Sequence, residues 1–151
     1  MSRPHELEAL IGYHLRRASS VMMADLAERL SRIGLTTTEA SILVVLHKEA
    51  GISQSEIGRR LAIKRANMAP LIAGLVAREI IGRGDRVGRI HPLTLTSAGG
   101  KLAAEARKRM DEHDANFFGE LSTDRRAQFQ EFLSELWQRP IVRTVETNAK
   151  A

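Results

Sequence analysis

The chain has 151 residues, of which 43% are hydrophobic and 27% charged, and this balance predicts one globular domain rather than a disordered chain. No stretch approaches about 20 uninterrupted apolar residues, and the first residues lack a signal-peptide core, so we expect a cytoplasmic protein with no membrane partner. The absence of cysteine excludes disulfides, thiolate nucleophiles and cysteine-based redox sensing.

The formal net charge of +5 lies in the middle third of the chain. Residues 48–91 hold nine basic and four acidic side chains, whereas the rest of the chain is neutral as a whole. A local excess of positive charge favours a polyanionic partner, most often nucleic acid. The same pattern also fits a solvated basic surface, so charge alone leaves both interpretations open.

The first third of the chain predicts two helices. An apolar stripe with spacings of three and four residues runs through 4–33, and Gly34 would end that long helix. Thr36 and Glu39 have the spacing of a capping box, in which a hydroxyl and a carboxylate satisfy backbone N–H groups at a helix start. The second helix would extend to Glu49, and its apolar residues on nearly every side imply burial.

The next segments predict a helix-turn-helix. Ser53 and Glu56 repeat the capping-box spacing at the start of a short helix. A second helix follows over about 64–78 after a tight connection, and two short helices joined in this way fit the motif. Pro70 lies within the second helix and removes a backbone donor, so we expect a local deviation or a later effective start.

The helical period then gives way to two short predicted strands. They cover 80–83 and 90–95, with 84–89 as the tip of a hairpin between them. A β-hairpin directly after a helix-turn-helix is typical of the wing of a winged helix. Two more helices are predicted after it, over about 97–119 and, capped by Ser122, over about 123–137.

We therefore expect a mainly α-helical fold, with a winged helix-turn-helix at 35–96 and long terminal helices at 1–34 and 97–151. The apolar faces of the terminal helices are larger than one small winged region needs, although part of them must serve the internal core. We expect the remainder to form an intertwined dimerisation region with a second copy. The residues that need such a partner are Leu7, Leu10, Ile11, Phe129, Phe132, Leu133 and Trp137.

Three segments, in this order and spacing, resemble the MarR family of bacterial transcription regulators. They are 35–43, 53–61 and 93–99, the last with the pattern L-x-L-T-x-x-G at the wing exit. The resemblance covers about 7–137 and implies a homodimeric, ligand-responsive regulator, most often a repressor, that binds a double-stranded DNA operator. A two-fold dimer predicts a pseudo-palindromic operator with half-sites about 10 base pairs apart.

The wing departs from the family pattern in two ways. The family often carries Asp-x-Arg before the wing exit, and here Arg89 holds the Arg position while Val87 stands in place of the Asp. The wing is also about two residues shorter. Asp85 is a candidate substitute partner for Arg89 or for Arg86.

The N-terminal turns of a recognition helix reach base edges in the major groove. Here those turns offer Arg65, which can bond guanine at two atoms, and Asn67, which can bond adenine in the same way. Ala66 permits close approach to the groove, Lys64 suits a phosphate, and Pro70 lies on the same stretch. The alternative is that these are ordinary exposed residues of a surface helix.

Two further segments complete the predicted DNA-binding surface. Arg86 at the hairpin tip can enter the minor groove, where A·T segments concentrate negative potential, and Arg83 and Arg89 can hold phosphates on either side. Side chains and backbone N–H groups at the start of the short third helix can donate hydrogen bonds to phosphate. For Ser53 the first role is the helix cap, and the phosphate contact is the second. The residues there are Ser53, Gln54 and Ser55. A solvated basic hairpin is the alternative for the wing.

Many members of the family release DNA when a small anionic, often aromatic, compound binds between the dimer helices and the winged region. An arginine can pair with the carboxylate of such a compound, and methionines adapt to flat apolar ligands. The candidate residues are Tyr13, His14, Arg16, Arg17, Met22, Met23 and His47. Core packing of the methionines and a solvated face for the arginines are the alternatives. The effector stays open between an aromatic acid and an acyl-CoA thioester.

Other kinds of site have little support. The cluster at 111–114 fits a solvated surface or an interface ion pair better than a metal site, so no metal is predicted. We find no nucleophile elbow, phosphate-binding loop or zinc pattern, so we predict neither an enzyme nor a cofactor. The competing function is a winged-helix module that contacts other proteins without sequence-specific DNA binding.

Overall fold

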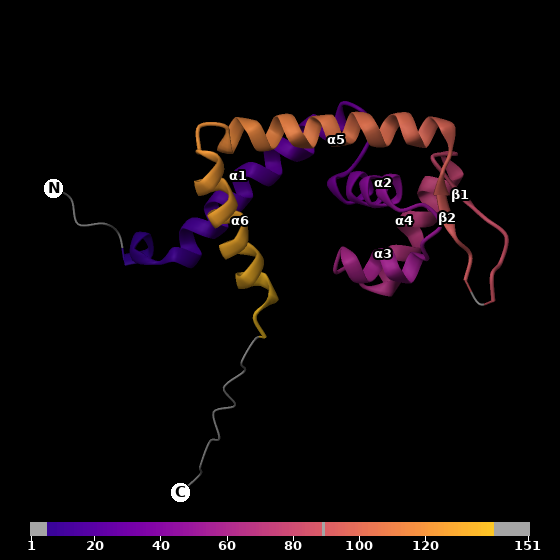
Figure 1. Ribbon diagram of the computed structural model, residues 1–151, viewed down its shortest axis with the longest axis horizontal. Helices are drawn as coiled ribbons and strands as arrows, with labels where there is room; N and C mark the ends of the chain where they lie inside the picture. Colours follow the sequence, from indigo (N-terminus) through magenta and orange to yellow (C-terminus); the bar gives the residue numbers. More distant parts are fainter. Residues whose placement is uncertain (1–5, 89, 141–151) are drawn as a thin grey trace, which may run out of the picture. The chain divides into compact units, whose positions relative to one another are not determined.

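A computed structural model describes residues 6–88 and 90–140 (Figure 1). The chain divides into two compact units between Asn116 and Phe117. None of the described helices is both long enough and apolar enough to cross a bilayer. In chain order the elements are η1 (Glu6–Ala9), α1 (Ile11–Ser31), α2 (Thr37–Lys48), α3 (Gln54–Arg60), α4 (Arg65–Ala77), β1 (Ile81–Arg83), β2 (Leu93–Leu95), α5 (Ser97–Phe118) and α6 (Thr123–Gln138).

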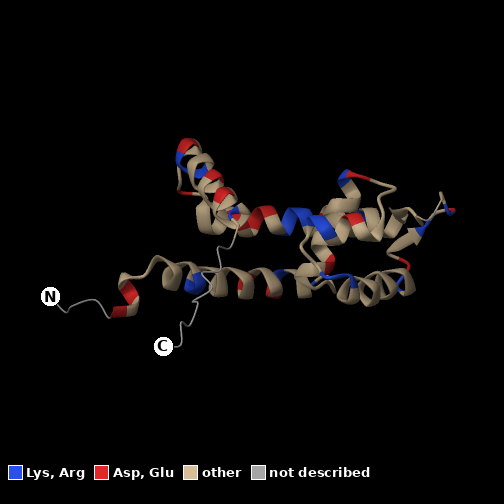
Figure 2. Ribbon diagram, turned by 90° about the horizontal axis from the view of Figure 1, so that it is seen from below, with Lys and Arg blue, Asp and Glu red and all other residues tan. Residues whose placement is uncertain are grey.

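The prediction of one continuous helix over 4–33 is wrong, because the described part is broken at Leu10. Leu10 has extended backbone dihedrals (φ −96°, ψ 121°), and the 3₁₀ turn η1, whose acidic residues are coloured red on the ribbon in Figure 2, precedes α1. Ile11, the first residue of α1, is 79% exposed, and Leu7 is exposed as well. Because most helical stability in proteins comes from packing of an apolar face, this uncovered end has little to maintain a single helix.

The capping-box prediction is confirmed in full for α2 and in half for α3. Thr36 Oγ1 accepts a hydrogen bond from the Glu39 N–H at 3.2 Å, and the Glu39 carboxylate accepts one from the Thr36 N–H at 2.8 Å. At α3, Ser53 Oγ accepts from the Glu56 N–H at 3.1 Å. The Glu56 carboxylate binds the Arg60 guanidinium at 2.9 Å, and a charged donor of this kind is a stronger partner than a backbone N–H.

The recognition-type helix α4 begins at Arg65, so the later start considered for it is wrong. The Met68 N–H donates to the Lys64 carbonyl at 3.1 Å, which closes the first turn before Pro70 is reached. Pro70 then removes one helical hydrogen bond, to the carbonyl of Ala66, and both residues are exposed. Water can satisfy that carbonyl, and α4 continues to Ala77.

The wing has the predicted antiparallel hairpin with shorter strands. β1 and β2 pair over three residues, from Ile81 opposite Leu95 to Arg83 opposite Leu93. Pro92 has no N–H to donate, which ends the ladder on that side of β2. A one-residue bridge joins Ile52 to Leu93 and attaches the α2–α3 connection to the sheet, a contact that the sequence did not predict.

One apolar core joins α2, α3, α4, the wing and the first half of α5. Its fully buried members on α5 are Ala103 and Ala106. The fully buried large side chains are Leu30, Ile42, Leu43, Leu46, Ile57, Met68, Ile72, Leu75, Ile81 and Leu93. The predicted burial of the second helix is thereby confirmed.

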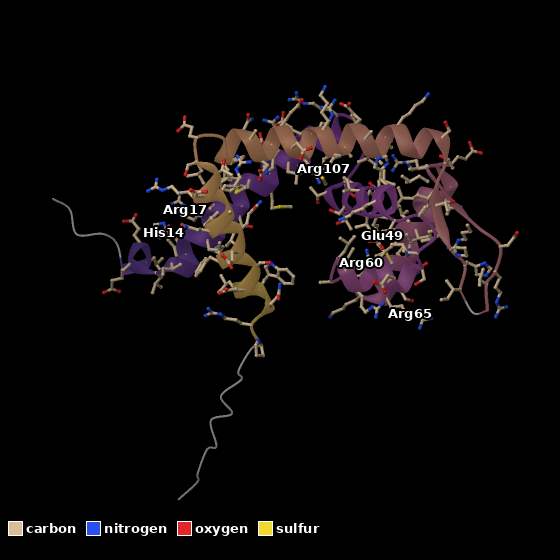
Figure 3. All side chains as sticks on the ribbon, viewed as in Figure 1. His14, Arg17, Glu49, Arg60, Arg65 and Arg107 are labelled. Carbon is tan, nitrogen blue, oxygen red and sulfur yellow. The ribbon has the colours of Figure 1, made fainter. Side chains whose placement is uncertain are left out.

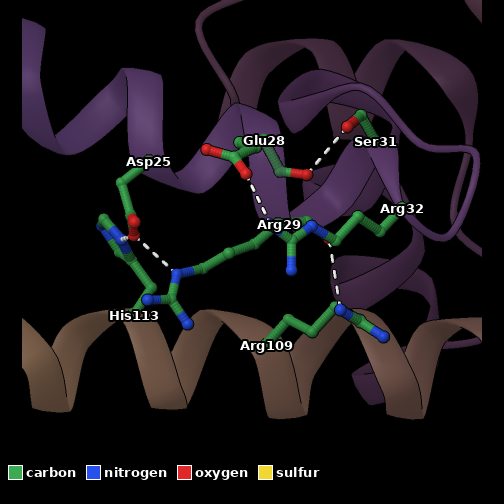
Figure 4. A network of polar contacts seen from close by, with 7 residues as sticks. All are labelled: Asp25, Glu28, Arg29, Ser31, Arg32, Arg109 and His113. Atoms are coloured by element: carbon green, nitrogen blue, oxygen red, sulfur yellow. Dashed lines mark hydrogen bonds and ion pairs between the residues drawn. The ribbon is translucent and has the colours of Figure 1, made fainter.

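A polar contact centred on Asp25 links α1 to α5 (Figure 4). Arg29 Nε donates to Asp25 Oδ2 at 2.6 Å, and Nδ1 of the 7% exposed His113 donates to the same oxygen at 2.8 Å. The sequence placed His113 in a solvated or interface cluster, and instead it is buried within its own chain. Asp111, in the same cluster, pairs with Arg107 at 2.7 Å. Among the described residues, no group of His, Asp and Glu could hold a metal ion.

Replacing Asp25 by asparagine is expected to lower stability at neutral pH and to flatten the acid side of the pH–stability curve. The hydrogen bonds from Arg29 and then from His113 hold the pKa of Asp25 below its ordinary value of 3.8. The ionised carboxylate therefore stabilises the fold above about pH 3.8, and this contribution is lost as the pH falls through the folded-state pKa. Urea unfolding at several pH values between about pH 3 and 6 gives the free energy of unfolding of both proteins. Parallel curves of this free energy against pH would contradict the role of Asp25.

The second unit consists of the end of α5 and α6. Ser122 Oγ accepts a hydrogen bond from the Arg125 N–H at 3.4 Å, as predicted for the cap of this helix. The rings of Phe118 and Phe129 lie in contact, with centroids 5.8 Å apart. No residue of α6, all of which is described, is buried, and Trp137 is 74% exposed. The apolar side chains of α6 are therefore open to a partner surface.

Candidate nucleic-acid interface

The turn between α3 and α4 brings the start of α4 to the surface beside α3. Ala62 adopts a left-handed conformation (φ 53°), and the Ile63 N–H donates to the Gly58 carbonyl at 2.9 Å. A Cβ on Gly58 would lie 3.2 Å from the Ile63 carbonyl oxygen, so a larger residue has little room there. The chain consequently reverses within a few residues, as a helix-turn-helix requires.

α4 separates into a buried face and an exposed N-terminal stretch. Met68, Ile72 and Leu75 pack into the core with at most 1% exposure. The residues predicted to contact bases and phosphates are all exposed: Lys64, Arg65, Ala66, Asn67 and Pro70. Burial of one face therefore fixes α4 and leaves the opposite N-terminal face available to a ligand.

Predicted DNA-contacting residues from three segments meet in one hollow of about 470 Å³, which we name the α4–wing hollow. Arg65 comes from α4 (Figure 3) and Arg83 from β1, and the start of α3 supplies hydroxyl and amide groups. Its lining is Ser53, Gln54, Ser55, Arg65, Arg83, Ile90, His91 and Leu93. Two guanidinium groups among neutral donors suit phosphate and base-edge oxygens. His91, Ile90 and Leu93 were not predicted here, because only the fold brings the wing strand to α3.

Ion pairs neutralise part of the basic segment and leave another part available (Figure 2, Figure 3). Arg60 binds Glu49 at 2.8 Å, and this hydrogen bond holds the pKa of Glu49 below its ordinary value of 4.5. Within 6–88 and 90–140, by contrast, Lys64, Arg65 and Arg83 make no ion pair. Uncompensated positive charge therefore remains at the start of α4 and on the wing, where it can attract a polyanion.

The wing tip differs from the expected bracing. Arg86 Nε donates to the Gly88 carbonyl at 2.7 Å. Across the described residues Asp85 forms no ion pair with Arg86, so the substitute pairing considered for these two is wrong. The left-handed backbone of Gly88 (φ 61°) makes a tight tip in which this carbonyl is the local acceptor. Arg89, the other candidate partner of Asp85 and a predicted phosphate contact, lies outside the described residues.

Four of the predicted effector-contacting residues meet on the first turns of α1. Arg17 Nη1 donates to the Tyr13 hydroxyl at 3.2 Å, and the guanidinium carbons of Arg16 and Arg17 each lie 5.7 Å from the centre of the Tyr13 ring. His14 Nε2 donates to the Glu8 carbonyl at 2.7 Å (Figure 3). The result is an exposed cationic and aromatic surface on one helix.

A second hollow, of about 340 Å³, lies where α1, α2 and the α3–α4 turn meet, and we name it the α1–α2 hollow. Of the predicted effector contacts, Met23 lines it, whereas Met22 and His47 do not. His47 lies near the C-terminal end of α2, whereas the α2 residues that line the hollow lie near its N-terminal end. The lining is Met23, Leu26, Thr37, Thr38, Ser41, Leu61 and Ile63. The other six lining residues were not predicted as effector contacts, because their sequence pattern indicates only helix capping and core packing.

The comparisons with known proteins agree with this geometry. Residues 33–90 match the sequence model of the MarR family. The HTH-type transcriptional repressor Rv2887 of Mycobacterium tuberculosis is 29% identical over 131 residues, which cover 85% of this chain and 94% of the repressor.

Solved repressor structures share the fold. The structure of the transcriptional repressor CouR bound to a 23-mer DNA duplex has a TM-score of 0.81 at 28% identity, and covers 91% of this chain and 99% of that one. CouR bound to p-coumaroyl-CoA has a TM-score of 0.79 at 27% identity, and the match covers 93% of this chain and 100% of that one. Rv2887 in complex with p-aminosalicylic acid has a TM-score of 0.66 at 28% identity, and the match covers 85% of this chain and 98% of that one. The predicted winged-helix fold is thereby confirmed.

Proposed function

We propose that the chain is a member of the MarR family of winged helix-turn-helix transcription regulators, and that it represses transcription as a homodimer which a small anionic effector releases from DNA. The α4–wing hollow carries the proposal, because Arg65 and Arg83 meet the polar side chains of 53–55 there. Within the described residues these arginines have no acidic partner. The protein acts by binding rather than by catalysis, and its chromosomal target places it in the cytoplasm.

Base readout falls to the exposed start of α4. Arg65 bonds guanine at O6 and N7, Asn67 bonds adenine at N6 and N7, and Ala66 contacts a thymine methyl. Lys64 and the side chains of 53–55 hold phosphates and so fix the register of α4 in the major groove, with Arg83 on the adjoining wing strand. Pro70 lies further along the same exposed stretch of α4.

The wing is proposed to read the minor groove through Arg86. Replacing Arg86 by alanine is expected to weaken operator binding by about 1 kcal/mol when the flanks are A·T-rich, at the low end for a lost arginine contact. The same variant should lose less affinity on an operator with G·C-rich flanks, where the groove is wider and its potential weaker. Fluorescence anisotropy with both duplexes measures the difference, and equal affinities of the variant and the natural protein on the A·T-rich duplex would remove the wing from the proposal.

The terminal segments 1–34 and 97–151 are proposed as the dimerisation region, and 35–96 as the DNA-binding region. Exposed apolar side chains at the N-terminal end of the described chain and on α6 support this division, because a second copy can cover them. They include Leu7, Leu10, Ile11, Phe129, Phe132 and Trp137. Two copies related by a two-fold axis would present two α4 helices to half-sites about 10 base pairs apart.

The α1–α2 hollow is the proposed effector site. Its hydroxyls sit at the start of α2, and its remaining walls are apolar, which suits a flat ring carrying an anionic group. The similar repressors were solved with p-aminosalicylic acid and with p-coumaroyl-CoA, which supports an aromatic acid or its thioester as the effector class. The cationic surface around Arg16 and Arg17 is a second place where an anionic group of a longer ligand could bind.

A gel-shift titration tests the function. The probe is the DNA upstream of the protein's own gene, with random duplex as competitor and salt varied. Tight, salt-sensitive binding that survives the competitor, and that an aromatic acid or its CoA thioester relieves, is the expected result. Binding no better than to random DNA would contradict sequence-specific regulation and would favour a winged-helix module that contacts other proteins.

A further inference from the structure

The C-terminal end of α4 is tied to the start of α2 by one arginine. Arg78 is the residue that ends α4, and its Nη1 donates to Glu39 Oε1 at 3.0 Å. Its Nη2 donates to the Gly34 carbonyl at 2.7 Å. Gly34 lies in the α1–α2 connection, so a single guanidinium binds the end of the recognition helix both to that connection and to the first turn of α2.

Glu39 is already committed to the cap of α2. Its Oε2 accepts from the Thr36 N–H at 2.8 Å and from Thr36 Oγ1 at 2.9 Å, while Oε1 binds Arg78. The Glu39 side chain is 15% exposed, so water competes weakly for these bonds. The carboxylate therefore moves with the first turn of α2, and Arg78 must follow it or lose its partner.

The same first turn of α2 forms a wall of the α1–α2 hollow. Thr37 and Thr38 lie between Thr36 and Glu39 in the chain, and with Ser41 they line the hollow together with Met23. A molecule that fills the hollow therefore contacts the turn that carries Glu39. Packed helices respond to a changed contact by discrete shifts rather than by continuous deformation.

We propose that the Glu39–Arg78 ion pair transmits filling of the α1–α2 hollow to the position of α4 on DNA. The inference rests on the proposed function, in which the hollow binds the effector and α4 binds the operator. Arg78 is a positioning residue: it touches neither ligand, and it holds α4 in the DNA-binding position while the first turn of α2 is undisturbed.

The chain's lack of cysteine allows the hollow to be filled without knowing the effector. Ser41→Cys places a single thiol in the lining, and benzyl methanethiosulfonate attaches an aromatic group to it as a disulfide that dithiothreitol removes. The coupling is the ratio of operator Kd after and before modification. It is measured in Ser41→Cys alone and after adding Arg78→Met, Glu39→Gln or both. Thermal melts show that each variant is folded.

Arg32→Met is the matched control. Arg32 also pairs with a glutamate, Glu28, at 2.5 Å, but both residues lie at the end of α1 and do not reach α4. In Ser41→Cys alone and with Arg32→Met, modification is expected to weaken operator binding about tenfold, within the usual range for coupled sites. With Arg78→Met or Glu39→Gln the ratio should fall below about 2, and the double variant should lose no more.

The outcomes separate this inference from the proposed function. An equal ratio in all backgrounds would overturn the role of the ion pair and leave the effector site standing. No effect of modification in Ser41→Cys alone, with operator binding intact, would overturn the effector site and the coupling together. A loss of affinity in Arg78→Met that is the same before and after modification would show a merely structural contact. Absence of specific DNA binding by the natural protein would reject the proposed function itself.

Discussion

Gly99→Ala is expected to destabilise the protein by about 3 kcal/mol, the upper part of the usual range for overpacking. A Cβ at Gly99 would lie 2.9 Å from the carbonyl carbon of Ile80 and closer still to its oxygen. That carbonyl already accepts from the Thr96 N–H at 3.1 Å, and Thr96 Oγ1 caps α5 by accepting from the Gly99 N–H at 3.0 Å. The methyl group must therefore displace the start of α5 from the base of the wing, where backbone on both sides is fixed (Figure 1).

Gly100→Ala is the matched control in the same helix turn. A Cβ at Gly100 would meet nothing within 4 Å, so this substitution should be neutral or stabilise the helix by about 0.5–1 kcal/mol. Urea unfolding of both variants at one protein concentration gives the comparison, because dimerisation makes stability concentration-dependent. Equal stabilities of the two variants would show that α5 is not seated on Ile80 as described.

Arg65→Ala is expected to weaken operator binding by about 1–3 kcal/mol and to relax specificity at one base position of each half-site. The side chain is exposed, lines the α4–wing hollow and has no ion pair in the described part of the chain. Binding of DNA therefore breaks no existing salt bridge, and the whole of the lost contact appears as lost affinity. Anisotropy titrations against operators substituted at each position measure both effects.

Arg107→Ala provides the matched loss of one positive charge. Arg107 lies on α5 and is paired with Asp111 at 2.7 Å (Figure 3). Its removal should change operator affinity by less than about 0.5 kcal/mol, as for an exposed paired charge away from the contact. If Arg65→Ala lowers affinity for operator and random DNA equally, Arg65 holds a phosphate and does not read a base.

Much of the fold could be predicted because it depends on local signals. Helix starts are set by capping groups a few residues apart, namely Thr36 with Glu39 and the hydroxyl of Ser53. The buried faces are set by the period of the apolar residues. The structure confirms these starts and the hairpin after α4. The break at Leu10 was missed because a stripe in the sequence does not say whether anything covers it.

The candidate site was predictable in part for the same reason. The exposed residues at the start of α4 follow from helix position and burial, whereas the α1–α2 hollow gathers side chains far apart in the chain. Arg78 and Glu39 are 39 residues apart, and no local pattern signals their pairing. The sequence also assigned Glu56 to a cap, although Glu56 and Arg60 have the i,i+4 spacing of an ion pair within α3. Only the second partner of Arg60, Glu49, depends on bringing α2 and α3 together.

Selection from a random duplex library tests most directly whether two α4 helices read DNA sequence as a symmetric pair. The natural protein is incubated with the library at moderate salt, bound duplexes are recovered over several rounds, and the enriched sequences are aligned. We expect a two-fold symmetric motif with half-sites about 10 base pairs apart, which Arg65→Ala degrades at one position of each half-site. Bound DNA with no enriched motif would contradict sequence readout, and an enriched motif without symmetry would contradict the dimer.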